Sequence, residues 1–128
     1  MAEDQISRPE IDAVWLSICR RLEENVVRIN SELKKDHVYL DIGNIIGIVK
    51  VREYGSGDVV GFELAMNTGG LQVWFQENLI RHDLYVESFT DKATKTRVYL
   101  LEGETLAIEE LVDRVFKRWL EKKWKLIR

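Results

Sequence analysis

The sequence predicts an α+β fold, in which a five- or six-stranded antiparallel sheet is flanked by a long N-terminal and a long C-terminal helix, both packed on one face. At both ends of the chain, apolar residues recur at three- and four-residue steps, which is the period of one helical face. Between these ends, apolar and polar residues alternate, and all eight glycines and four tyrosines lie within residues 39–103. The expected order of elements is α-β-β-β-(short α)-β-β-α.

The first helix is expected between about Pro9 and Lys34. Ser7 can cap its N-terminus by accepting a hydrogen bond from the backbone of Glu10, whose side chain can reach back to Ser7. Proline suits the first turn of a helix, because the N–H groups there have no intrahelical partner. The apolar face of this helix comprises Ile11, Val14, Trp15, Ile18, Leu22, Val26, Ile29 and Leu33.

Three strands are expected after the first helix. Residues 38–42 alternate apolar and polar side chains, and Gly43-Asn44 offers a turn. The segments 45–54 and 59–66 flank Gly55–Asp58, whose glycines and short polar side chains are typical of a hairpin turn. A phosphate-binding loop would need a helix after these glycines, so the hairpin is the better interpretation.

The second half of the chain is expected to hold another hairpin and the last helix. Residues 76–83 are polar enough for a short helix or a loop, and residues 84–89 and 96–102 alternate as two paired strands. Gly103 should end the second of these strands, and Thr105 should cap the last helix. This order of elements resembles that of the small acidic dimeric chaperones of type III secretion.

Composition points to a single intracellular domain. A chain of 128 residues with 45% hydrophobic residues can bury a core, so we expect a short flexible N-terminus at 1–7 and one α+β domain at 8–128. The single cysteine cannot form an internal disulfide, and no apolar run approaches the roughly 18 residues of a membrane span. The acidic N-terminus does not fit a signal peptide, and a cytoplasmic location without membrane attachment is expected.

Charge is distributed unevenly along the chain. Residues 114–128 hold seven basic side chains and one acidic side chain, whereas the whole chain has a net charge of −3. The remaining residues therefore carry about −9. We expect three acid-before-base pairs four residues apart on the last helix, which are Glu110 with Arg114, Asp113 with Lys117, and Glu121 with Lys125.

Basic side chains without helical partners make the last helix the candidate interaction surface. The expected partner-binding residues are Arg118, Trp119, Lys122, Lys123, Trp124 and Arg128, since tryptophan and arginine commonly anchor protein interfaces. Because the rest of the chain is acidic, we expect these bases to pair with acidic side chains of the same molecule or with an acidic second subunit, either another protein or a second copy, before a polyanion. The alternative is a nucleic acid, on which Trp124 would stack. The leading hypothesis is a small non-enzymatic protein-binding module, such as an adaptor, a chaperone-like factor or a regulatory subunit.

No residue pattern indicates catalysis, a cofactor or a metal ion. Cys19 lies inside the first expected helix, where an inert packing role is the better interpretation. His82 and Asp83 follow an irregular region that could form a pocket, but neighbouring residues of a strand point to opposite faces. We therefore expect them, like Asp36 and His37, to be polar residues where strands begin.

Overall fold

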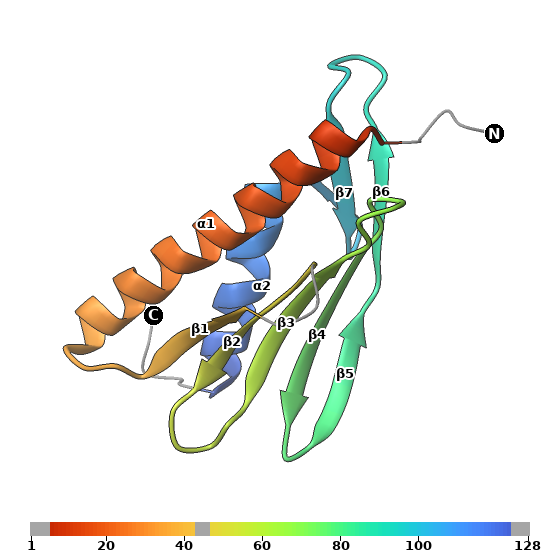
Figure 1. Cartoon of the computed structure of the whole chain (residues 1–128). Coiled ribbons are helices and arrows are strands. Elements are labelled where there is room, and N and C mark those ends of the chain that lie inside the picture. The colour runs from red at the N-terminus through yellow and green to blue at the C-terminus, as the bar shows by residue number, and fades with distance from the viewer. Residues whose placement is uncertain (1–5, 43–46, 124–128) are drawn as a thin grey trace.

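The computed structural model describes residues 6–42 and 47–123, and these residues confirm the α+β prediction (Figure 1). Two helices and eight strands are present in this part of the chain. The strands form two antiparallel sheets, one of β1 to β5 in chain order and one of β6 to β8. The bounds are α1 Arg8–Leu33, β1 Val38–Ile42, β2 Ile48–Glu53, β3 Val59–Leu64, β4 Leu71–Glu77, β5 Ile80–Leu84, β6 Val86–Thr90, β7 Arg97–Leu101, β8 Glu104–Leu106 and α2 Ile108–Lys123.

Helix α1 begins and ends close to where the sequence places it. Ser7 has the extended conformation of an N-cap, and its Oγ accepts a 3.3 Å hydrogen bond from the backbone N–H of Glu10. Lys34 ends the helix in the left-handed region at a φ of 58°. Ile6, within the expected flexible segment, is buried and packs beside Gly69. The Asn30 amide then ties the end of α1 to β1, because its oxygen accepts from the backbone N–H of His37 at 2.9 Å.

One hydrophobic core joins both helices to both sheets. Phe62 on β3 lies between Val49 on β2 and Val73 on β4, and all three side chains are fully buried. They belong to the same cluster as Ile18 of α1 and Trp119 of α2. Figure 1 shows both helices on the same side of the five-stranded sheet. The opposite face of that sheet is therefore left without a helix.

The five-stranded sheet agrees with the predicted five or six strands, but a second sheet of three strands accompanies it. The short helix expected at residues 76–83 is wrong, because these residues belong to β4, a turn and β5. A tight turn at Asn78 and Leu79, with φ values of 51° and 67°, instead connects β4 to β5. Two positive φ angles are the mark of a type I′ turn, and asparagine tolerates them whereas leucine rarely adopts them. Because no Asn-Gly pair marks this turn, its sequence does not resemble a hairpin.

The hairpin expected from residues 84–89 and 96–102 is confirmed as β6 and β7, but a third strand follows it. Thr105 pairs with Leu100 within β8, so the expectation that it caps the last helix is wrong. The Ala107 carbonyl accepts the first helical bond from Leu111, at 2.9 Å. Glu110 Oε1 accepts from the backbone N–H of Ala107 at 3.1 Å and satisfies this donor at the start of α2.

A polar clamp joins α1 to α2. Arg21 donates from Nε and Nη2 to the two carboxylate oxygens of Asp113, at 2.8 and 2.6 Å. Asn25, which is fully buried, donates to Asp113 Oδ1 at 3.0 Å and accepts from Arg28 at 2.6 Å. Asp113 thus bonds to α1, and the expected pair with Lys117 is not the contact that forms.

The clamp also changes the ionisation of its members. Hydrogen bonding to Arg21 lowers the pKa of Asp113, although burial opposes this shift, and the Asn25 amide lowers it further. The hydrogen bond to Asp113 in turn raises the pKa of Arg21. The charged forms of both side chains are therefore favoured in the folded protein.

Replacing Asp113 by asparagine should lower the free energy of unfolding by about 1–2 kcal/mol near neutral pH, because Arg21 loses its charged acceptor. A carboxyl group whose folded pKa is lowered contributes stability above its unfolded pKa and loses it as pH falls through the folded pKa. The difference between the wild type and Asp113→Asn should therefore shrink as the medium becomes acidic. Urea unfolding at a series of pH values measures this difference.

The matched control is Asp12→Asn, because Asp12 forms an exposed pair with Arg8 within α1. That substitution should change the free energy of unfolding by less than about 0.5 kcal/mol. A loss at Asp12 as large as that at Asp113 would contradict the role of the clamp.

Candidate functional site at the β5 edge

Two basic side chains of α2 form ion pairs with acidic side chains of the same molecule. Arg118 forms a 2.6 Å ion pair with Glu102, and Arg114 forms a 2.8 Å ion pair with Glu104. The pair expected between Arg114 and Glu110 within the helix is not the contact that forms, because Glu104 at the start of β8 is the acidic partner of Arg114 instead. Trp119 is fully buried, so this fold gives no partner access to it and the expectation that it is an interface residue is wrong.

The other four predicted interface residues lie at the C-terminal end of the chain. Lys122 and Lys123 belong to the last turn of α2, but their side chains lie outside what the structure describes. Trp124 and Arg128 lie outside the described residues, as does the expected pair of Glu121 with Lys125. In the described part of the chain, no helix has the combination of length and apolar character needed to cross a membrane.

His82 and Asp83 lie in the middle of β5, and the prediction that they begin a strand is wrong. They face opposite sides of the sheet, as expected. His82 is paired with Phe75, whose side chain belongs to the core, while Asp83 is paired with Trp74, which lies outside the core cluster. The two side chains therefore do not meet in one pocket.

Asp83 belongs to a cluster on the face that carries no helix. The indole of Trp74 covers Gly61 on the neighbouring strand, where a Cβ atom would lie 2.3 Å from the ring. The guanidinium of Arg81 lies over the same indole at 4.1 Å, and its Nε is 2.7 Å from Asp83 Oδ1. Trp74 is consequently only 4% exposed, and Arg81 is held in a defined position at the edge of the sheet.

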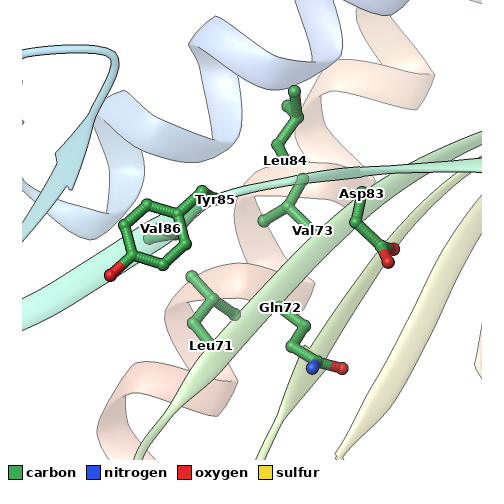
Figure 2. A pocket seen from close by; sticks show the side chains of 7 residues that line it. All are labelled: Leu71, Gln72, Val73, Asp83, Leu84, Tyr85 and Val86. Atoms are coloured by element: carbon green, nitrogen blue, oxygen red, sulfur yellow. The ribbon is translucent and has the colours of Figure 1, made fainter.

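A shallow groove lies beside the start of β4, where Tyr85 connects β5 to β6 (Figure 2). β4 pairs with β5 as far as Leu84, and the chain then bends at Tyr85 before β6 pairs with β7. The resulting hollow of ≈ 320 Å³ is lined by Leu71, Gln72, Val73, Asp83, Leu84, Tyr85 and Val86. In Figure 2, the side chains of Gln72 and Asp83 point toward the same side. The groove thus lies beside the edge strand and combines apolar walls with polar groups.

Apolar side chains at both ends of β5 are unusually exposed. Leu79 is 90% exposed, Ile80 60% and Tyr85 77%, although the protein has a well-filled core. β5 is one of the two edge strands of its sheet, and Figure 1 shows it at the edge opposite β1. An edge strand presents unpaired backbone N–H and C=O groups, which can pair with another chain. This segment, residues 79–85, is called the β5 edge below.

Two side chains that could suggest catalysis, the half-buried Cys19 and the buried Tyr99, have raised pKa values. Burial, aided by the charge of Glu23, raises the pKa of the Cys19 thiol to about 11, which disfavours the reactive thiolate. Burial also raises the pKa of Tyr99 to about 12. Among the described residues, no group of three or more His, Cys, Asp or Glu side chains could hold a metal ion.

Comparison of the chain with protein-family models, with curated proteins and with solved structures finds no match.

Gly61→Ala should destabilise the fold by about 1–3 kcal/mol, because the new methyl group would overlap the indole of Trp74. The same substitution should cost almost nothing in a Trp74→Leu background, where the ring is absent. Urea unfolding of the wild type, both single variants and the double variant measures the coupling between the two positions. Equal costs of Gly61→Ala in both backgrounds would show that the contact is unimportant.

Cys19 should react with iodoacetamide roughly 100-fold more slowly in the folded protein than in urea at pH 8, since its raised pKa reduces the thiolate fraction. Mass spectrometry of the alkylated protein over time gives both rates. Comparable rates in the folded and unfolded protein would contradict the inert packing role.

Proposed function

We propose that the protein is a small non-enzymatic protein-binding module, which receives an extended segment of another polypeptide at the β5 edge. The observation that carries this proposal is the exposure of Leu79, Ile80 and Tyr85 at the two ends of the edge strand β5. Strand addition of this kind uses backbone hydrogen bonds for affinity and neighbouring side-chain pockets for specificity.

The side chains of the β5 edge support this mode of binding. An added strand would place alternate side chains on the two faces of the sheet. On the face without helices, these side chains would meet Arg81 and Asp83, which offer both signs of charge. Near the bend, they would meet Tyr85 and the groove beside it. Apolar contacts at the ends and charges between them would fix the direction and register of the added strand.

The proposal assigns partner binding to the β5 edge instead of the C-terminal helix. Arg114 and Arg118 form ion pairs with acidic side chains of the same molecule, which reduces the positive charge that a nucleic acid would meet there. Binding of nucleic acid through the C-terminal helix stays a prediction. The exposed apolar groups of β5 favour a protein partner instead.

A photo-activated cross-linking amino acid at position 80 should yield adducts with a partner protein in cells that produce the full chain, because Ile80 lies on the β5 edge. The matched control is position 27, since Val27 is apolar and 64% exposed but belongs to helix α1, which offers no unpaired strand. Mass spectrometry identifies each adduct. Adducts that form at position 80 but not at position 27 support the proposal, whereas equal or absent adducts at position 80 overturn it.

A further inference from the structure

We infer that the segment received at the β5 edge is β5 of a second copy of this chain, paired antiparallel about a two-fold axis at His82. The two five-stranded sheets would then continue into one sheet across the interface. This inference rests on the proposed function, because it names the occupant of the same edge.

The symmetry of the sequence around His82 carries the inference. A two-fold axis perpendicular to a sheet keeps each side chain on its own face, so residues equally distant from the axis face each other across an antiparallel pair. With His82 at the axis, Arg81 faces Asp83 of the second copy, and this contact occurs twice. Ile80 then faces Leu84 of the second copy. Just outside the strand, the two exposed side chains Leu79 and Tyr85 also face each other.

No neighbouring register gives the same agreement. An axis at Arg81 would place two arginines opposite each other, and an axis at Asp83 would place two aspartates opposite each other. Like charges directly opposite in a sheet are destabilising. An axis at Ile80 or Leu84 would pair only one residue of the strand with its counterpart. The register centred on His82 alone pairs all five residues of β5 without facing like charges.

The fold leaves room for this arrangement and prepares one of its contacts. The helices make their main contacts with β1, β2, β7 and β8, and the helix-side residue Ile80 of β5 is exposed. A second sheet can therefore approach without meeting a helix. The stacking of Arg81 on Trp74 already restricts the guanidinium at the edge, which reduces the entropy lost when Asp83 of the second copy binds.

The size of the contact predicts a weak dimer. A pair of five-residue strands with two flanking apolar contacts falls below the roughly 1,200 Å² that stable interfaces bury. Dimers should therefore form with increasing protein concentration. A two-fold contact also closes on itself, whereas β5 of one copy against β1 of the next would give an open-ended fibre.

The first experiment is a charge exchange followed by sedimentation velocity across the micromolar range. Arg81→Asp and Asp83→Arg should each weaken the dimer by about 10-fold, because each variant places like charges opposite each other at two positions. The double variant with both substitutions should restore the wild-type dissociation constant. Circular dichroism melting checks that every variant is folded. A double variant as weak as the single variants, or a wild type that is monomeric throughout, overturns the inference.

The second experiment fixes the register by cross-linking in a Cys19→Ala background. His82→Cys should form a disulfide with itself under mild oxidation, since facing residues of an antiparallel pair have Cα atoms about 4.5–5.5 Å apart. The control, Ile80→Cys, should not, because the two cysteines would lie about 13 Å apart along the strands. Cross-linking at position 80 instead of 82, or growth of fibres, overturns the inference.

The two proposals fail in different ways. If photo-cross-linking at position 80 captures a different, identified protein while the chain remains a monomer, the second-copy inference is overturned and the protein-binding function stands. If position 80 captures no protein at all, both are overturned.

Discussion

The ion pair between Arg21 and Asp113 is the contact on which the arrangement of the helices depends. It joins the middle of α1 to the first half of α2, and the buried Asn25 amide extends it into the core. Together with the hydrophobic core that both helices share with the strands, it holds them on one side of the five-stranded sheet (Figure 1). The other face and the last strand are consequently left without a helical cover, and the candidate site lies there.

On the uncovered face, local contacts bury the indole of Trp74. Trp74 is covered by the guanidinium of Arg81 and lies against Gly61, which has no side chain to obstruct it. At the edge of this face, Leu79 and Tyr85 flank β5 and are the two most exposed large apolar side chains among the described residues. The contrast between a sealed face and an exposed edge is what distinguishes β5 as an interaction surface.

The sequence predicts the elements whose signals are local, and it misses those set by distant contacts. Ser7 and the glycines around Ser56 mark a helix start and a hairpin that the structure confirms. The turn at Asn78 and Leu79 is not predicted, because leucine seldom adopts a positive φ. Without this turn, the strand β5 that follows it is not predicted either. Trp119 lies at helical spacing from Val115 and Phe116 on the apolar face of the last helix, and all three side chains are buried, so the preference of interfaces for tryptophan does not apply to it.

The clamp also bears on the order in which the chain can acquire its structure during synthesis. Its two ends, Arg21 and Asp113, are 92 positions apart, whereas β1 to β5 pair only with neighbours in the chain. Hairpins between neighbouring strands close short loops and lose little entropy. A nascent chain can thus pair β1 to β5 early in synthesis. The apolar face of α1, in contrast, is fully covered only after α2 has been synthesised.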